Sequence, residues 1–302
     1  PQAESIFQEV RGGTGHAVRL ALQGGPEKGS VLVCAGDTPL LTGNALQTLI
    51  QSHSDSSSVS TILTAEVPDP FGYGRIVRST NAPVARIVEE KDASEDEREI
   101  TEINSGVYVF DIAALTDALT KITTSNSQKE EYLTDVIKVM TAAGKKVSAY
   151  CLEDFTETLG INDRAQLAEC AALMQARINH AVMVSGVSIV DPATTWIDVT
   201  VEIEKDVTIK PGSALHGTTS ISSGAIIGPR TTLMDCRVGS GAEILESFCQ
   251  NIAICQHSCW IFRRDQEFHT WRWFKGATSL LCRRCHDWKR IKHRCSHSFR
   301  QL

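Results

Sequence analysis

The stretch Ser30-Val31-Leu32-Val33-Cys34-Ala35-Gly36-Asp37-Thr38-Pro39 decides the fold class of this chain. Its first six residues form a continuous apolar run, which is typical of a strand that is buried on both faces of a parallel sheet. A helical stretch follows near residues 42–52, and a second β-rich run extends from Val59 to Val67. This alternation of strand and helix predicts an α/β fold.

Asp37 comes directly after the first predicted strand. Ligands of open α/β sheets bind beyond the carboxyl ends of the strands, so Asp37 is a candidate site residue. Its carboxylate is suited to a Mg²⁺ ion that bridges phosphate oxygens. By position alone a second interpretation is equally open, in which Asp37 only begins the turn before Pro39.

The length and composition exclude several classes of protein. At roughly 150 residues per domain, 302 residues predict about two domains. No apolar run approaches the ~18 residues that a membrane-spanning helix needs, and a net charge of −6 argues against a nucleic-acid partner. The cysteines at 34, 151, 170 and 236 occur singly, which is typical of reduced thiols and predicts a cytoplasmic protein.

The net charge hides a change of composition near residue 248. Residues 1–248 hold 19 Lys and Arg against 33 Asp and Glu, whereas residues 249–302 hold 11 against 3. The final 54 residues also carry six of the ten cysteines and four of the five tryptophans. We expect a non-native or disordered tail at 248–302, produced by a frameshift after about residue 247. A one-base shift turns each Trp codon into a Gly codon, so the shifted frame is rich in glycine.

Three other interpretations of the tail have less support. Cys282-Arg283-Arg284-Cys285-His286 has the form of a c-type haem attachment site, and Cys282 and Cys285 with His293 and His297 are the residue types of a zinc site. The two pairs are closer together than zinc-finger spacing requires, and haem attachment needs an oxidising compartment. A basic tail that binds a nucleic-acid strand rests only on charge and aromatic residues.

A glycine cluster at residues 12–15 precedes a helix-like stretch near the start of the chain. Glycines let a backbone approach a base or phosphate closely, and the N–H groups at a helix N-terminus favour anions. The segment is not a P-loop, since no Lys-Ser or Lys-Thr follows it. Taken alone, a simple turn explains it as well.

Seven motifs occur in order over about residues 2–247. They are Gln-x4-Gly-Thr-Gly-His-Ala from Gln8, Ala-Gly-Asp-Thr-Pro-Leu from Ala35, Phe-Gly-Tyr-Gly-Arg-Ile from Phe71, Ile-Val-Glu-Glu-Lys-Asp-Ala from Ile87, Ile-Asn-Ser-Gly-Val-Tyr from Ile103, Gln-Lys-Glu-Glu-Tyr-Leu-Thr-Asp from Gln128 and Gly-Ile-Asn-Asp-Arg from Gly160. The set closely resembles bacterial N-acetylglucosamine-1-phosphate uridyltransferase. That family is bifunctional and also acetylates glucosamine-1-phosphate in a C-terminal left-handed β-helix.

The resemblance implies a partial Rossmann-like nucleotidyltransferase domain. Its reaction joins UTP to N-acetylglucosamine-1-phosphate, releases pyrophosphate and gives UDP-N-acetylglucosamine for peptidoglycan and cell-envelope precursors. The resemblance also implies Mg²⁺ as the cofactor and a homotrimer in the intact family. No catalytic side chain is implied beyond groups that position the metal and the substrates.

The resemblance assigns site residues by their match to the motifs. It assigns Gln8, Gly13 and Thr14 to the uracil end of the nucleotide. It assigns Asp37, with Ala35 and Gly36 before it, to binding of the nucleotide and Mg²⁺. It implies that Asn162 is the second protein ligand of the metal. The N-acetylglucosamine portion is lined by Gly74, Glu89 and Asn104. The chemical types agree, because amide and carboxylate oxygens suit Mg²⁺ and sugar hydroxyls.

Other residues in and near these motifs have secondary roles. Tyr132 and Thr134 are expected near the sugar, and His16 is expected to pack on or cap its helix rather than act as a general base. The segment 127–130 predicts a capping box. After it, helical spacing predicts three core residues, Leu133, Ile137 and Met140.

The family's Gly-rich loop on the first strand, and a lysine shortly after it, are not found in this sequence. We therefore expect that the chain begins after the first βα unit, that the acetyltransferase site is missing and that this polypeptide is inactive. Two further hypotheses stay open. One is another sugar-1-phosphate nucleotidyltransferase, and the other is a non-catalytic fragment for sugar-nucleotide binding or trimerisation.

The period of the sequence changes after a helix-like linker at 164–183. Aliphatic residues recur every six positions from Ile203 to Leu233. Each six-residue side of a triangular coil puts one aliphatic residue inward, so the pattern predicts the first coils of a left-handed β-helix at 184–247, made of hexapeptide repeats. The nucleotidyltransferase domain is then expected at 1–163 and the tail at 248–302.

Overall fold

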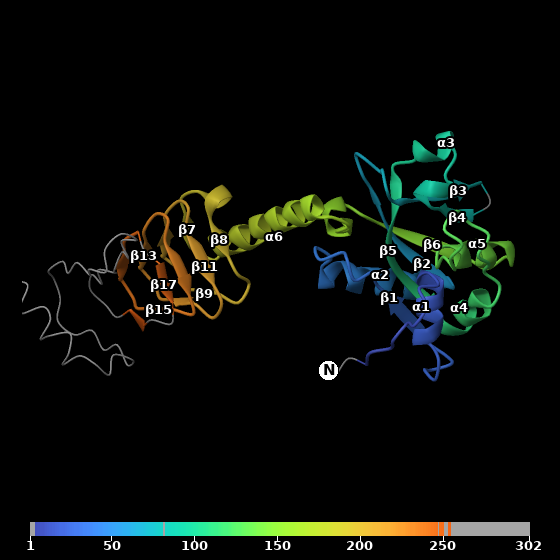
Figure 1. The fold of residues 1–302 in the computed structure, drawn as a ribbon, viewed down its shortest axis with the longest axis horizontal. Coiled ribbons are helices and arrows are strands. Elements are labelled where there is room, and N and C mark those ends of the chain that lie inside the picture. The colour runs from blue at the N-terminus through green and yellow to red at the C-terminus, as the bar shows by residue number, and fades with distance from the viewer. Residues whose placement is uncertain (1–3, 81, 247, 251–252, 255–302) are drawn as a thin grey trace, which may run out of the picture. The chain divides into compact units, whose positions relative to one another are not determined.

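The computed structural model describes residues 4–80, 82–246, 248–250 and 253–254. The chain divides after Cys170 into two compact units (Figure 1). Within those described ranges, no helix is long and apolar enough to cross a membrane.

The first unit is built on a mixed six-stranded sheet. Its strands are β1 (Ser30–Val33), β2 (Ser60–Glu66), β3 (Gly74–Ser79), β4 (Ala82–Val88), β5 (Glu102–Asp111) and β6 (Val147–Leu152). The order is β4-β3-β5-β2-β6, and β1 pairs with β5. β2 and β6 run parallel, whereas the other neighbours are antiparallel.

Helices cover both faces of this sheet, which confirms the predicted α/β, Rossmann-like class. The helices are α1 (Thr14–Ala21), α2 (Gly43–Ser56), α3 (Glu95–Arg98), α4 (Ile112–Leu119) and α5 (Asp135–Ala142), with short 3₁₀ turns η1 (Glu90–Asp92) and η2 (Phe155–Thr158). α1, α4 and α5 pack with Ile62 and Phe110 in one core. α2 packs with Leu63 and Val109 in the other, so alternate residues of β2 and β5 face opposite layers.

The prediction for the strand at residues 30–35 is partly wrong. β1 is a strand, but it pairs antiparallel with β5, and its residues 31–33 are only half-buried. The reason is that β1 and β3 share one edge of β5. β1 takes residues 108–111 of that edge and β3 takes residues 103–104, so β1 has a single strand partner among the described residues.

The predicted capping box at 127–130 is also wrong. Asn126 binds Glu130 twice, accepting from its N–H at 3.2 Å and donating to its carbonyl oxygen at 2.5 Å, so the segment closes as a turn. The N–H and hydroxyl of Ser127 bind Asp92 instead. A capping box does occur at the start of α3, where Ser94 and Glu97 bind each other's backbone. The three residues predicted for the core, at 133, 137 and 140, are buried.

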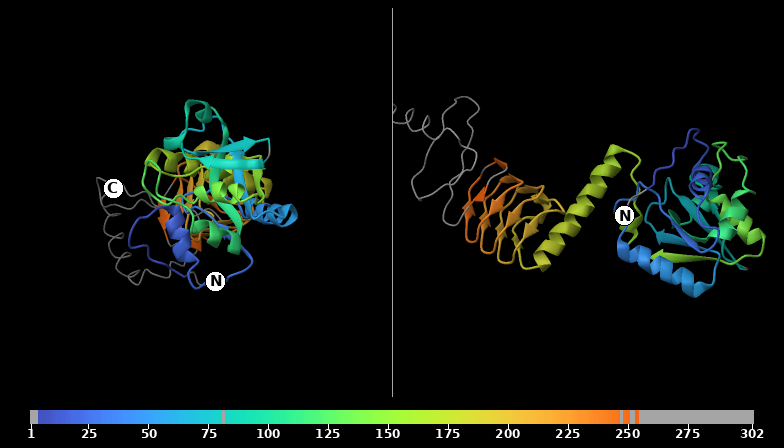
Figure 2. Two further views of the ribbon diagram at one scale, coloured as in Figure 1. Left: turned by 90° about the vertical axis from the view of Figure 1, so that its right-hand side faces the viewer. Right: turned by 90° about the horizontal axis from the view of Figure 1, so that it is seen from below.

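The second unit is a β-solenoid like the predicted left-handed β-helix (Figure 2). Its strands are β7 (Ser188–Ile189), β8 (Trp196–Ile197), β9 (Glu202–Ile203), β10 (Thr208–Ile209), β11 (Ala214–His216), β12 (Ser220–Ile221), β13 (Ile226–Ile227), β14 (Thr232–Met234), β15 (Arg237–Val238), β16 (Glu243–Ile244), β17 (Phe248–Gln250) and β18 (Ala253–Ile254), with a 3₁₀ turn η3 (Pro192–Thr194). They form three parallel four-stranded sheets. The aliphatic residues of the six-residue repeat point into one shared core.

The strand ladder extends beyond the predicted boundary at 247. β17 pairs with β14, and β18 pairs with β15. Cys249 stands in register with Leu233, and its side chain is buried in the same core. The remaining part of the predicted tail, 255–302, including the Cys and His pairs considered as haem or zinc ligands, lies outside the described residues.

The C-terminal half of α6 (Arg164–Val184) covers the first coil of the solenoid. Ile178, Val182 and Met183 pack against the solenoid core. Asn179 is buried and donates to the carbonyl oxygens of Pro192 and Thr195 at 2.8 and 2.9 Å. The helix therefore satisfies carbonyl groups that the end of a stack leaves open.

Candidate functional site

The three residues predicted to line the sugar come together from β3, β5 and the end of β4. Gly74 pairs directly with Asn104 across the two strands. A methyl group at Gly74 would lie 3.4 Å from Glu89 Oε2 and 3.5 Å from Asn104 Cβ. The absence of a side chain at Gly74 therefore leaves open the space between the Glu89 carboxylate and Cβ of Asn104.

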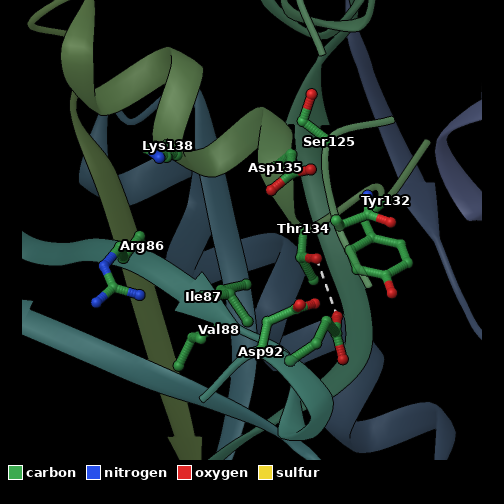
Figure 3. A pocket seen from close by; sticks show the side chains of 11 residues that line it. Arg86, Ile87, Val88, Asp92, Ser125, Tyr132, Thr134, Asp135 and Lys138 are labelled. Carbon is green, nitrogen blue, oxygen red and sulfur yellow. Dashed lines mark hydrogen bonds between the residues drawn. The ribbon is translucent and has the colours of Figure 1, made fainter. Parts of the chain in front are cut away.

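Glu89 is held in place by a hydroxyl. Thr134 Oγ1 donates to Glu89 Oε1 at 2.9 Å, the dashed line in Figure 3. Burial raises the pKa of Glu89, and the nearby carboxylates of Asp135 and Asp92 raise it further, whereas the hydrogen bond from Thr134 lowers it. The carboxylate is thus a shielded acceptor with one oxygen fixed.

Glu89 and Thr134 line a pocket of about 240 Å³ (Figure 3). Its lining is polar and comes from β4, η1, the segment before α5, and α5 itself: Arg86, Ile87, Val88, Glu89, Asp92, Ser125, Asn126, Tyr132, Thr134, Asp135 and Lys138. Carboxylates and hydroxyls in a small concave site are suited to the hydroxyl groups of a sugar.

The glycine cluster near the start of the chain lies against the segment that leads into this pocket. Gly15 N–H donates to Glu131 O, and Glu131 N–H donates to Gly12 O, both at 2.8 Å. The Thr14 hydroxyl accepts from Leu133 N–H at 3.0 Å. A methyl group at Gly13 would lie 2.5 Å from Glu131 O, so this approach requires glycine. The predicted uracil residues are thereby tied to the segment that carries Tyr132 and Thr134.

Gln8 stands over the same cluster. Its amide nitrogen lies 3.3 Å from Gly13 O and 3.0 Å from His16 Nδ1. The sequence predicts a packing or capping role for His16, and the structure adds this contact with a predicted base-binding side chain.

The predicted metal ligands come from two segments that are joined by their backbones. Asp37 O accepts from Ile161 N–H at 2.9 Å, and Asn162 is the next residue. Both side chains are exposed. The Thr38 hydroxyl donates to Ala35 O at 3.2 Å, which fixes the turn that contains Gly36 and Asp37.

A carboxylate and an amide oxygen are hard donors and fit Mg²⁺. In the described ranges no group of three or more His, Cys, Asp or Glu side chains could hold a metal. Asp37 and Asn162 would supply two ligands of a Mg²⁺ ion, which commonly keeps several water molecules in its coordination shell.

Sequence reasoning missed four charged residues of the pocket lining, Arg86, Asp92, Asp135 and Lys138. The sequence motifs could have indicated two of them, because Asp92 follows Glu89 by three positions and Asp135 follows Thr134 by one. Arg86 and Lys138 carried no such signal. Lys138 faces the pocket only because α5 begins at Asp135, which puts residues three apart on one helix face.

Comparisons with known proteins place the chain in a family. The nucleotidyl transferase family model matches residues 1–200. The chain is 51% identical over 247 residues to the bifunctional protein GlmU of Streptomyces coelicolor, covering 81% of this chain and 51% of that protein. It is 48% identical over 250 residues to the bifunctional protein GlmU of Streptococcus mutans, covering 82% of this chain and 54% of that protein. The chain thus spans about half the length of the curated relatives that it matches.

Proposed function

The chain belongs to the nucleotidyl transferase family, and we propose that its site serves uridylyl transfer from UTP to N-acetylglucosamine-1-phosphate. The products are UDP-N-acetylglucosamine and pyrophosphate. The observation that carries the proposal is the convergence of Gly74, Glu89 and Asn104, of which Glu89 lines a pocket of about 240 Å³. Identity of about 50% to bifunctional proteins named GlmU supports the same reaction class.

The chemistry needs positioning more than proton transfer. An oxygen of the sugar-1-phosphate attacks the α-phosphorus of UTP, and the bond from that phosphorus to the pyrophosphate oxygen breaks. The attacking phosphate oxygen is already ionised, so no general base is required. The chain's contribution is to hold the two substrates in line and to exclude other geometries.

Each part of the site has a role in this proposal. Gln8 and the backbone at 12–14 contact the base, and Glu89 and Asn104 bind the sugar. Asp37 and Asn162 would hold Mg²⁺, which supplies neutralisation of charge on the phosphate oxygens when it is bound.

Two further proposals concern the whole protein. A homotrimer is proposed because β-solenoids of hexapeptide type commonly associate in threes. A cytoplasmic location is proposed because the cysteines at 34, 151, 170 and 236, in the part of the chain that the structure describes, are free thiols.

The test is binding of UDP-N-acetylglucosamine to the 302-residue chain by calorimetry, with Mg²⁺ and with EDTA. We expect Mg²⁺-dependent binding that is weaker for UDP-glucose, dTDP-glucose and ADP-glucose. Glu89→Gln is expected to weaken it, and Glu66→Gln, on the same sheet but outside the site, is the control. A preference for another base or sugar would move the proposal to that nucleotidyltransferase, and no binding of any sugar nucleotide would contradict it. Pyrophosphate release from UTP and N-acetylglucosamine-1-phosphate, measured alongside, tests the expectation that this polypeptide is inactive, and turnover at a rate typical of enzymes would contradict it.

A further inference from the structure

Arg75 is the residue after Gly74 on β3, and its side chain is 2% exposed. Its Nη2 donates to Glu90 Oε2 at 2.7 Å, and its Nη1 donates to the carbonyl oxygen of Tyr73. Its Nε has no hydrogen-bond partner although it is buried. Removing a guanidinium and a carboxylate from water costs about as much as their pairing returns, so such a pair contributes little to stability.

Glu90 gathers groups from three segments. The oxygen that accepts from Arg75 also accepts from Gly72 N–H at 3.3 Å. The other oxygen lies 3.6 Å from Arg98 Nε on α3. Glu90 therefore fastens the loop before β3 and the helix after η1 to the turn that follows Glu89.

Each end of the Arg75–Glu90 pair leads to a different part of the site. On one side, Tyr73 accepts from Gly160 N–H at 3.3 Å through its hydroxyl, and Ile161 N–H binds Asp37 O. On the other side, Glu89 is the residue directly before Glu90, and its carbonyl oxygen accepts from Asp92 N–H at 2.9 Å. A continuous set of bonds thus runs from the predicted metal ligands to the predicted sugar ligands.

We propose that Arg75 and Glu90 are positioning residues that fix the metal end and the sugar end of the site relative to each other. Neither side chain lines the pocket, so both act through Tyr73, Gly74 and Glu89. The role of the pair in catalysis rests on the proposed function. That the pair connects the two ends of the site rests on the hydrogen bonds alone. Because both ends depend on one pair, loss of the pair affects sugar and metal binding together.

A second pair on the same strand provides a matched control. Arg78 donates to both oxygens of Glu102 at 2.7 Å, and the Glu102 carboxylate is also largely buried. Neither residue lines the pocket. Glu102→Gln removes the same charge as Glu90→Gln and lowers stability without reaching the site.

The first measurement is hydrogen exchange of the Gly160 amide in the 302-residue chain. Its hydrogen-bond acceptor is the Tyr73 hydroxyl rather than Glu90. We expect exchange at least about tenfold faster in Glu90→Gln and in Arg75→Lys, and unchanged in Glu102→Gln once global stability is matched by temperature. Unchanged exchange in both test variants overturns the proposal, independently of the measured ligand affinities.

The second measurement is affinity for UDP-N-acetylglucosamine with and without Mg²⁺. Glu90→Gln is expected to lose about tenfold in affinity and most of the Mg²⁺ effect, whereas Glu102→Gln stays within about twofold of the parent. Loss of sugar affinity with the Mg²⁺ effect intact overturns the coupling of the two ends. A parent chain that binds no sugar nucleotide contradicts the proposed function instead, and the exchange comparison then decides the positioning role. Near-ultraviolet circular dichroism confirms that each variant is folded, and if Arg75→Lys is not, Glu90→Gln alone carries both measurements.

Discussion

The hydroxyl of Thr134, at the start of α5, donates a 2.9 Å hydrogen bond to the carboxylate of Glu89, at the end of β4. This bond joins two motifs that are 45 residues apart in the chain. It fixes one carboxylate oxygen and leaves the other beside Gly74 and Asn104.

Thr134→Val removes this bond while keeping the shape of the side chain. The bond favours the charged form of Glu89, so the variant is expected to raise the pKa of Glu89 further above its ordinary value. Affinity for UDP-N-acetylglucosamine is expected to fall by about threefold to tenfold, the worth of one hydrogen bond. NMR titration of the Glu89 carboxyl and calorimetry measure the two effects.

Thr141→Val is the matched control for that variant. Thr141 is also on α5, and its hydroxyl binds Ala85 O on β4 at 2.8 Å, outside the pocket lining. Its loss should leave the pKa of Glu89 and the ligand affinity unchanged. Equal effects from the two variants would show that they act through stability rather than through Glu89.

Gly13→Ala is expected to destabilise the first unit and to weaken nucleotide binding. The added methyl group would meet Glu131 O at 2.5 Å, and the backbone has φ of 100°, which suits glycine. The cost in the free energy of unfolding is about 1–3 kcal/mol, as for other residues in sparsely populated conformations. Gly24→Ala, with φ of 77° and no atom within 4 Å of the added methyl, isolates the backbone part. If both variants unfold at the same denaturant concentration, the Glu131 contact does not matter.

The two fold classes were predictable because their signals are local. Six-residue spacing from Ile203 to Leu233 needs only the repeat itself, and it predicts the solenoid core that the structure has. The partner of β1 was not predictable, because the sharing of one edge of β5 by β1 and β3 depends on strands 30 to 80 residues away. The segment at 127–130 satisfied a local capping rule, but the Asn126 side chain competes for the backbone of Glu130 and closes a turn.

The candidate site divides in the same way. Motif order predicted Gly74, Glu89 and Asn104, and the sheet register then brings them together. Arg75 stood in a quoted motif without a role, because only the structure reveals that its guanidinium is buried against Glu90. The pocket's cations, Arg86 and Lys138, depend on where β4 and α5 meet, which sequence spacing does not encode.

His53 makes the stability of the first unit depend on pH. It is buried on α2, and its Nδ1 lies 3.0 Å from the Thr61 hydroxyl on β2. Burial lowers its pKa, and the nearby Asp111 carboxylate only partly opposes this. The unfolded chain therefore takes up a proton at a higher pH than the folded chain does. The contribution of neutral, buried His53 to the free energy of unfolding is therefore complete above pH 6.5, and it is lost as the pH falls below that value.

Urea unfolding at pH 7.5 and at pH 5.5 tests this dependence. The parent chain is expected to lose more of its free energy of unfolding on acidification than His53→Gln does. His180→Gln, which changes an exposed histidine of α6, should behave like the parent. Identical pH profiles for the parent and His53→Gln would contradict the assignment.

Asp37→Asn tests the metal end of the site. The variant keeps the side-chain shape and leaves the Asp37 carbonyl bond to Ile161 unchanged, but it removes a negative hard donor. We expect the Mg²⁺-dependent part of UDP-N-acetylglucosamine affinity to fall by at least about tenfold, and the affinity in EDTA to stay the same or rise, because a carboxylate near the phosphates is then gone. Asp55→Asn on α2, where the exposed Asp55 carboxylate accepts from Gln51, controls for the change in net charge. A Mg²⁺ effect of full size in Asp37→Asn would assign the metal to other groups.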